Sequence, residues 1–257
     1  MAKRVLQGIA LLCAALMVAA GGRPAPAPAK VSDQGVYTYV ALWGVPRAQW
    51  GQIEKFYKDA VPTLDKLVAN GTLTGWGNAR VFVHDDTGIT HESWITATSF
   101  ADIVRALDAV RTAVPQPAAA FAGSKHVDEL LRATIHGQKP EASGAGLLWV
   151  ASYEVRPDQM EEIARLFETG IKPLFDEQMA AGTILSYSLN FQAVHTGPEG
   201  GVSIAYLLPD AAAIDKFQTA LAAYEALHPE IGPSMEATME YAAHRDSVYE
   251  VLSFGQK

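Results

Sequence analysis

The second half of this chain repeats the first. The sequence matches itself at an offset of 111 residues, with no gap between Pro46 and His84. Prolines and glycines, which restrict the backbone in defined ways, fall in register among the identical positions. The sequence therefore predicts two copies of one module, an internal duplication and not a solenoid. The identical pairs are Pro46/Pro157, Phe56/Phe167, Pro62/Pro173, Asp65/Asp176, Ala69/Ala180, Gly71/Gly182, Thr72/Thr183, Val83/Val194 and His84/His195.

Each copy shows the same order of predicted elements. Alternating residues from Tyr37 to Val45 indicate a strand, and apolar residues at helical spacing follow from about Arg47 to Asn70. A hairpin with a glycine-containing turn comes next, then a second helix with Ser99 or Asp210 as its N-cap. A last strand completes the order βαββαβ of ferredoxin-like folds. The remaining predicted strands are 73–84, 92–98 and 130–136 in copy one and 148–155, 184–195, 202–208 and 248–254 in copy two.

Prolines and glycines mark the first helix of each copy. Pro62 and Pro173 fall within it, where a proline should kink or divide a helix. Gly71 and Gly182 stand where a helix needs a left-handed C-terminal residue. The later segments 111–125 and 225–243 are rich in Ala, Pro and Met, and we expect extra helices there, over an end of the fold or an interface.

Tandem βαββαβ modules of this kind resemble the dimeric α/β-barrel superfamily, with its stress-responsive A/B barrel, EthD-like and NIPSNAP-like groups. The resemblance rests on element order, the mid-helix proline, the Gly-Thr entry to the second strand and its Val-His end, over about residues 36–254. It implies an α+β fold in which tandem ferredoxin-like repeats, 36–140 and 146–257, pair their sheets into one barrel. The superfamily includes haem enzymes, cofactor-independent monooxygenases, isomerases and proteins without known chemistry, so the resemblance implies architecture and no single activity.

The first 35 residues are predicted to lie outside the fold. Residues 1–22 have a basic start, an apolar stretch and small residues, which is the pattern of a secretory signal peptide; an uncleaved anchor is the alternative. Residues 23–35 form a Pro/Ala-rich linker. The only cysteine, Cys13, lies in the signal segment and is not preceded by the small residue of a lipoprotein signal. We expect an exported protein, periplasmic or secreted, without disulfides and without stable membrane association after cleavage.

Charge and motifs exclude several classes of function. Of the 20 basic residues, Lys3 and Arg4 lie in the signal segment, so the mature chain has 18 basic and 28 acidic residues and a net charge of −10. Without a basic stripe, nucleic acid is not an expected partner. The sequence has no GxGxxG, P-loop, GxSxG or HExxH motif, so no cofactor and no metal is predicted. A homo-oligomer is compatible with the sequence.

Alternation along the strands assigns the barrel interior. If helices cover one face of each sheet, the other face lines the barrel. In the strand 73–84, the larger and more polar set with Trp76, Asn78 and Arg80 is assigned to the interior, and the small set with Gly77 and Ala79 to the helix side. The predicted interior is aromatic and suits a small, mostly apolar ligand. The predicted ligand-binding residues are Tyr39, Trp43, Trp76, Trp149, Tyr153, Tyr187, Phe191 and His195.

Three residues of copy one form the predicted catalytic set. Asn78 and Arg80 would hold an oxyanion, and His84 would act as a general base. Copy two has Leu189 and Phe191 in place of Asn78 and Arg80, so copy one would carry the chemistry. Three alternatives stay open: aromatic side chains that are core packing, histidines that bond a turn or bind a metal, and a one-residue register shift that turns Arg80 outward.

A second histidine pattern recurs at an offset of 118, as His126-x-Asp128 and His244-x-Asp246. The carboxylate, two residues from the ring, could orient it as in half of a catalytic pair. Because the pattern occurs in both copies, a shared structural role in docking the last strand is favoured.

The sequence supports two functional hypotheses. The first is an exported barrel that binds a small hydrophobic or aromatic molecule, with cofactor-independent monooxygenation or isomerisation as its chemistry. The alternative is a packed, non-enzymatic barrel that serves as an interaction or structural module and exposes an apolar patch. Haem binding follows only from the resemblance and ranks last, because no predicted helix carries an evident proximal histidine. Whether the chain is an enzyme stays open.

Overall fold

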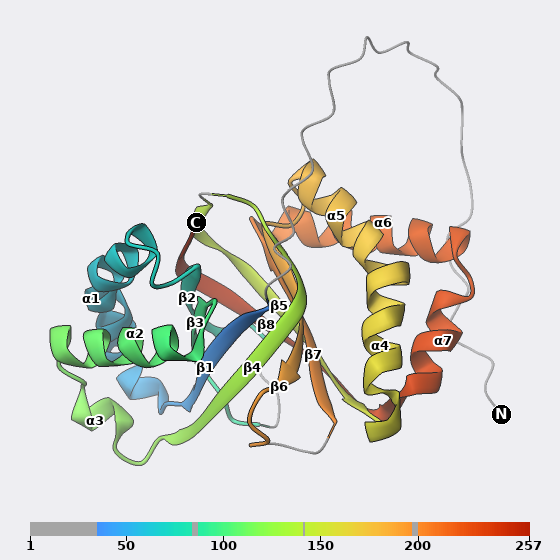
Figure 1. Ribbon diagram of the computed structural model, residues 1–257. Helices are drawn as coiled ribbons and strands as arrows, with labels where there is room; N and C mark the ends of the chain where they lie inside the picture. Colours follow the sequence, from blue (N-terminus) through green and yellow to red (C-terminus); the bar gives the residue numbers. More distant parts are fainter. Residues whose placement is uncertain (1–34, 84–86, 141, 197–199) are drawn as a thin grey trace, which may run out of the picture.

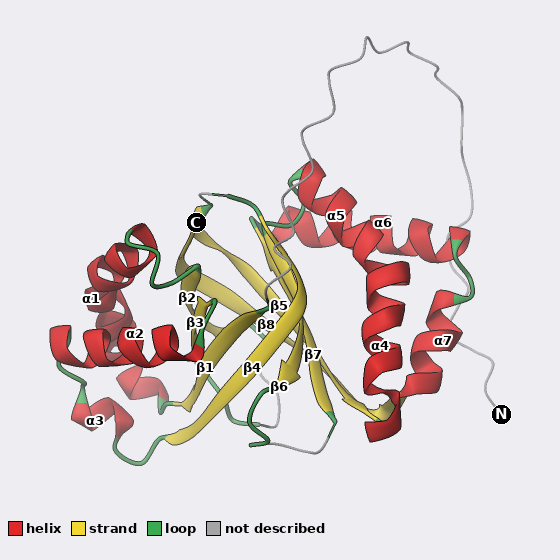
Figure 2. Ribbon diagram, in the orientation of Figure 1, coloured by secondary structure: helices red, strands yellow, loops and turns green. Residues whose placement is uncertain are grey.

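The computed structural model describes residues 35–83, 87–140, 142–196 and 200–257, which form a closed barrel between two groups of helices (Figure 1). Helices α1 to α3 lie on one side of the barrel and α4 to α7 on the opposite side (Figure 2). The first half of the chain contains β1 (Val36–Gly44), α1 (Trp50–Ala69), β2 (Gly75–Val81), β3 (His91–Ala97), α2 (Phe100–Ala113), α3 (Ala118–Phe121) and β4 (Lys125–Gln138). The second half contains β5 (Ser143–Val155), α4 (Met160–Leu166), α5 (Lys172–Ala181), β6 (Ser186–Gln192), β7 (Gly201–Leu208), α6 (Ala211–Leu227), α7 (Ile231–Thr238) and β8 (Met239–Gln256).

The barrel is antiparallel, with the strand order β1-β3-β2-β8-β5-β7-β6-β4. Each half contributes four neighbouring strands, β4-β1-β3-β2 and β8-β5-β7-β6, and the halves join where β2 pairs with β8 and β4 with β6. Closure removes the free edges that an isolated sheet would expose. The predicted α+β class and the single barrel are confirmed.

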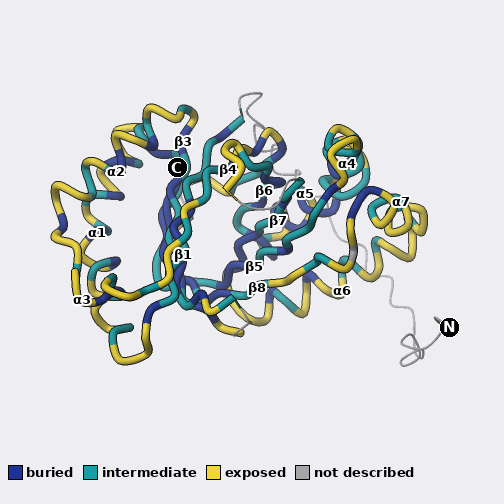
Figure 3. The backbone as a smooth tube through the Cα atoms, turned by 90° about the horizontal axis from the view of Figure 1, so that it is seen from below, coloured by how far each residue is buried: buried dark blue, intermediate teal, exposed yellow. Residues whose placement is uncertain are grey.

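The apolar core lies in layers between the barrel wall and the helices. One cluster packs α1 and α2 against the first four strands, around Leu64, Ile95 and Ile103. A larger one packs the helices of the second half around Phe167 and Tyr206. Figure 3 shows the buried chain concentrated in the strands, with exposed residues on the outer helices. This burial leaves the inner face of the barrel to a separate set of side chains.

The mid-helix prolines have different effects in the two halves. Helix α1 runs unbroken through Pro62, so the predicted division is absent there. In the second half a π-helical segment, Phe167–Ile171, separates α4 from α5, and Pro173 lies in the first turn of α5. Proline has no N–H to donate and is tolerated in a first turn, which explains the break before it. The short helices α3 and α7 lie in the two segments that predicted extra helices.

The predicted signal peptide, residues 1–22, and the predicted linker up to residue 34 lie outside the described residues. Among the helices that are described, none has the length and the apolar composition needed to cross a membrane.

Candidate functional site

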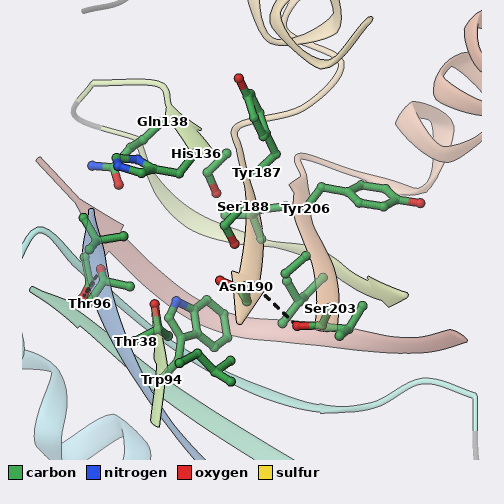
Figure 4. A pocket seen from close by; sticks show the side chains of 18 of the residues that line it. Thr38, Trp94, Thr96, His136, Gln138, Tyr187, Ser188, Asn190, Ser203 and Tyr206 are labelled. Carbon is green, nitrogen blue, oxygen red and sulfur yellow. Dashed lines mark hydrogen bonds between the residues drawn. The ribbon is translucent and has the colours of Figure 1, made fainter. Parts of the chain in front are cut away.

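The barrel encloses a cavity of about 1210 Å³. Its wall takes alternate residues from the strands, for example Thr38 and Val40 of β1 and Ser186 and Ser188 of β6, as expected when one face of each strand points inward (Figure 4). At one mouth the wall also includes part of helix α5. The cavity is therefore bounded by the strands of the barrel and, at one mouth, by α5.

Two carboxyl groups face the cavity on either side of β1. Glu92 of β3 is the register partner of Leu42, and Glu129 of β4 is the partner of Val40 on the opposite edge of β1. Glu92 is only 6% exposed, and the Tyr249 hydroxyl of β8 donates a hydrogen bond to it. The two acids thus give one wall of the barrel an acidic character.

The barrel interior changes the protonation of both carboxyl groups. Burial, reinforced by the negative charge of Glu129, raises the pKa of Glu92 to about 8. Burial also raises the pKa of Glu129. A low-dielectric site disfavours the charged form, and two nearby carboxylates disfavour double ionisation. Near neutral pH the protonated form of Glu92 therefore predominates, beside a second carboxyl group.

A row of polar side chains crosses the facing wall. Asn190, Ser203, Ser152 and Arg245 are successive register partners on β6, β7, β5 and β8, and all line the cavity. Asn190 Nδ2 donates to Ser203 Oγ at 3.4 Å, the dashed line in Figure 4. Asn190 is 4% exposed, and its Oδ1 has no hydrogen-bond partner among the residues that the structure describes. A buried amide oxygen without a partner is costly, and a bound ligand could supply one.

Trp94 is the largest side chain on the inner face of β3. Its indole lies over Gly77 of β2, where an added Cβ would come within 2.0 Å of the ring. The apolar side chains Leu148, Leu207 and Phe254 complete this part of the wall. The site thus joins an apolar, aromatic region to the pair of carboxyl groups.

The prediction of which face of β2 points into the barrel is wrong, and the cause is the position of Trp94 on the neighbouring strand β3. Trp76 contributes to the cavity wall, but its Nε1 donates to Asp65 Oδ1 of α1 at 3.1 Å, so its ring packs against the helices. Asn78 and Arg80 alternate with it on the same outer face. The small residues of β2 point inward because the ring from the neighbouring strand already occupies that space.

Arg80 lies in a charged cluster beneath α1 instead of the predicted oxyanion site. Its Nη1 is 3.0 Å from Glu54 Oε1, and its Nη2 is 2.6 Å from Glu250 Oε2. The buried His91 ring places Nε2 3.8 Å from the same Glu54 carboxylate. Burial, with the charge of Arg80, lowers the pKa of His91 to about 4, so this ring is neutral at pH 7. The cluster attaches α1 to the sheet.

The aromatic side chains predicted to line the cavity from β1 and β5 also lie on the outer face. On β1 the cavity takes Val36, Thr38, Val40 and Leu42, which leaves the alternate set to the helices. On β5 it takes Leu148, Val150 and Ser152, with the same result. The assignment is therefore wrong by one residue on both strands. The residues concerned are Tyr39, Trp43, Trp149 and Tyr153.

The recurring His-x-Asp patterns explain what these outer aromatic residues do. Each histidine ring stacks on an aromatic ring of the neighbouring strand, with centroid distances of 3.6 Å in the first half and 4.6 Å in the second. Each aspartate accepts a hydrogen bond from another aromatic residue of that strand. These contacts fit the favoured role of docking the last strand. The pairs are Trp43 with His126, Tyr39 with Asp128, Tyr153 with His244 and Trp149 with Asp246.

The other predicted site residues are scattered. Tyr187 borders the mouth of the cavity, and its hydroxyl group donates a hydrogen bond to the carboxylate of Asp176 in α5. Phe191 faces outward near the seam between β4 and β6, and His195 is exposed beyond the end of β6. His84, the predicted general base, lies outside the described residues.

Sequence reasoning missed the residues that do line the cavity: Glu92, Trp94, Glu129, Asn190 and Tyr249. One signal was available, since Glu92, Trp94 and Thr96 alternate with Ser93 and Ile95. An acidic residue within a strand of a closed barrel faces either the cavity or the helix layer, and both are water-poor. Only the pairing of the strands shows which of these faces it occupies.

Comparisons with known proteins support the fold. No family model matches the chain, and no curated protein matches its sequence. The structure is similar to a candidate monooxygenase from Fusobacterium nucleatum, with a TM-score of 0.64 at 10% identity, over 88% of this chain and 96% of the other. A candidate monooxygenase from Lactobacillus acidophilus has a TM-score of 0.58 at 6% identity, over 86% of this chain and 96% of the other. These likenesses show a shared fold, which agrees with the barrel that the resemblance implied.

Proposed function

We propose that the barrel interior binds a small, mostly apolar molecule. The observation that carries this proposal is the cavity of about 1210 Å³, because protein cores are close-packed and leave few empty spaces. Typical ligand pockets occupy roughly 300–1,000 Å³ and combine an apolar wall with a few polar groups. Val40, Leu148 and Leu207 with Glu92 and Glu129 provide that combination. The cavity favours ligand binding over the alternative of a packed interaction module.

We propose further that the bound molecule is a substrate. The raised pKa of Glu92 lies near neutral pH, where a carboxyl group can both give and take a proton. Glu129 places a second acid beside it, which suits proton transfer during isomerisation or cofactor-independent oxygenation. The two similar structures, both of candidate monooxygenases, support this direction. The carboxyl pair replaces Asn78, Arg80 and His84 as the proposed catalytic groups.

We also infer that the chain is a tandem duplication of a ferredoxin-like module and is exported. Two observations support the duplication: the strand orders β4-β1-β3-β2 and β8-β5-β7-β6 correspond, and the His-x-Asp contacts recur in both halves. Export is supported by the pattern of residues 1–22 and by the absence of cysteine from the rest of the sequence. Fractionation of the native cells tests export, and recovery of the protein in the cytoplasm would contradict it.

Binding of a neutral fluorescent probe tests the proposed cavity. N-phenyl-1-naphthylamine becomes bright in apolar sites, and we expect the protein to bind it with a stoichiometry of about one. Ala205 lines the cavity, so Ala205→Phe should fill part of it and weaken binding by roughly tenfold or more. Ala212 is exposed on α6, and Ala212→Phe is the matched control. The same affinity in both variants would refute the cavity as the binding site.

A further inference from the structure

We propose that the ligand of the barrel carries a protonated amine, which lies between the carboxyl groups of Glu92 and Glu129 while its apolar body packs against Trp94. This inference rests on the proposed function, because it needs a ligand inside the barrel. It adds a chemical class that neither the fold nor the comparisons supply: an organic cation with an aromatic or aliphatic body.

The first support is the placement of the two acids. Glu92 and Glu129 lie on the strands that flank β1, opposite Leu42 and Val40, and both point into the same cavity. Glu92 is almost fully buried, and Tyr249 reaches it from β8 as a hydrogen-bond donor. A single ammonium group has three donors and can bond more than one acceptor at once. The two carboxyl groups thus form a ready receptor for it.

The second support is that no cation of the described part of the chain stabilises the charged form of either carboxyl group. The causes acting on the two pKa values are burial, the repulsion of Glu92 by Glu129 and the Tyr249 hydrogen bond. Among the described residues, no cation lowers either pKa. Near pH 7 the protonated form of Glu92 therefore predominates, and a bound cation is the partner that either buried carboxyl group needs in order to ionise.

None of the four lysine and arginine side chains that line the described cavity contributes to the pKa shift of either carboxyl group. Lys172 forms an ion pair with Asp176 on α5, at 2.7 Å. The Nζ atom of Lys139 lies near Gly182 at the end of α5, and the Nζ atom of Lys257 lies near Gly71, just beyond the end of α1. Arg245 faces inward at the register position of Ser152, in the row that crosses the wall opposite β1. The other titratable side chains of the wall are His136, Tyr187, Tyr206 and Tyr249.

The third support is independent of the acids: the buried amide of Asn190 has an unpaired oxygen. Asn190 is 4% exposed and lines the cavity. Its Nδ2 donates a hydrogen bond to Ser203 Oγ, whereas its Oδ1 accepts none from the described residues. It lies on β6, the neighbour of the strand that carries Glu129. An acceptor without a donor in a water-poor cavity indicates a ligand that brings donors of its own. An amine brings them, and a hydrocarbon does not.

The fourth support is the aromatic ring beside the acids. Trp94 follows Glu92 by two residues on the same face of β3. Indole rings attract cations through their π face, and they also pack against apolar groups.

The second half of the barrel has no equivalent pair of acids. At the offsets of 111 and 118, Ser203 stands in place of Glu92 and Ser247 in place of Glu129. The barrel therefore has one acidic wall, and we expect one amine per chain.

Calorimetric titration of a matched pair of ligands tests this inference. Phenylethylamine is a cation at pH 7, and phenylethanol is a neutral molecule of nearly the same shape. We expect the amine to bind at least about tenfold more tightly, which is the effect of one hydrogen bond to a charged group. Titrations in two buffers with different heats of ionisation should show release of up to about one proton per amine, because the cation displaces the proton of the pair.

Two isosteric substitutions remove the acids. Glu92→Gln and Glu129→Gln should each lower the affinity for the amine by about tenfold and leave binding of N-phenyl-1-naphthylamine nearly unchanged. Retained binding of this neutral probe shows that the variant is folded. Glu161→Gln changes an exposed glutamate of α4 and should have no effect.

The outcomes separate this inference from the proposed function. If the neutral probe binds but amine and alcohol bind equally well, or the substitutions do not alter the preference, the inference is wrong and the cavity remains a binding site. If neither the probe nor either ligand binds the wild-type protein, the proposed function fails, and the inference fails with it.

Discussion

At the residue scale, the carboxyl group of Glu92 should make stability depend on pH. In the unfolded chain this group loses its proton near its usual pKa of 4.5, whereas the folded protein keeps it until about pH 8. Between these values the folded state binds more protons, so the free energy of unfolding falls as pH rises, by up to about 1.4 kcal/mol per pH unit. The amide of Glu92→Gln cannot ionise, so this variant should show a shallower decline.

Urea unfolding between pH 5 and pH 8 measures this effect. The wild-type protein and the Glu92→Gln variant should differ most at the alkaline end, where ionisation of this group in the unfolded chain has lowered the stability of the wild type alone. Parallel stability curves for the two proteins would mean that Glu92 is not buried as described.

Gly77 offers a second test at this scale, because its missing side chain makes room for Trp94. A methyl group at this position would lie 2.0 Å from the indole, so Gly77→Ala should destabilise the protein by about 1–3 kcal/mol. Gly51 is exposed in α1 with nothing near its absent Cβ, and Gly51→Ala should stabilise by about 0.5–1 kcal/mol. Thermal unfolding compares the two; a tolerated Gly77→Ala would contradict the inward position of Trp94.

The same residues show why the site was harder to predict than the fold. The alternation in the strand 73–84 is clear, but it does not reveal which face is inside. Large side chains such as Trp76 suggest a cavity lining, yet here they pack beneath α1. The decisive fact is that Trp94 of β3 fills the space over Gly77, and this depends on the pairing of two strands.

At the element scale, periodicity and turn residues predicted the order of helices and strands correctly, because these signals are local. The lengths of the last strand of each half, in contrast, depend on contacts that are distant in the sequence. The sequence predicts 130–136 and 248–254, whereas β4 covers Lys125–Gln138 and β8 covers Met239–Gln256. Each of these strands pairs with a strand of the other half as well as its own. Their lengths follow from barrel closure, which the pattern of one copy does not show.

The ends of β4 and β8 lock the two halves together at one mouth of the barrel. Gln138 Nε2 donates to the carbonyl oxygens of Thr74 and Lys257, at 3.2 and 2.7 Å. Gln256 Nε2 donates in the same way to those of Lys139 and Leu185, at 2.9 and 3.3 Å. The two glutamines thus make equivalent bonds, each with one bond inside its own half and one to the other half.

Removing one of these amides should loosen this mouth. Gln256→Ala should lower the free energy of unfolding by about 1–2 kcal/mol, the usual contribution of one or two hydrogen bonds. Hydrogen exchange should increase at the start of β6, next to Leu185. Gln218 is exposed on α6, so Gln218→Ala is the control. Unchanged exchange at β6 in the Gln256 variant would show that the bonds contribute nothing to the seam.

At the scale of the whole molecule, one chain forms a closed barrel with helices on two opposite sides. The helix layers bury most of the aromatic side chains, and this leaves the inner wall to aliphatic, polar and acidic residues around Trp94. The hydroxyl and carboxyl groups of that wall would be unsuitable for a dry, packed core. The composition of the wall therefore agrees with an interior that holds a ligand.

Accessibility of a thiol inside the barrel tests this central claim most directly. Cys13 is the only cysteine, so a Cys13→Ser protein can carry single reporters. Ser203 lines the cavity and Thr219 is exposed on α6. We predict that a small neutral alkylating reagent modifies both Ser203→Cys and Thr219→Cys, and that saturating N-phenyl-1-naphthylamine protects only the first. A thiol at position 203 that never reacts, or that reacts equally with and without the probe, would contradict a ligand-binding interior.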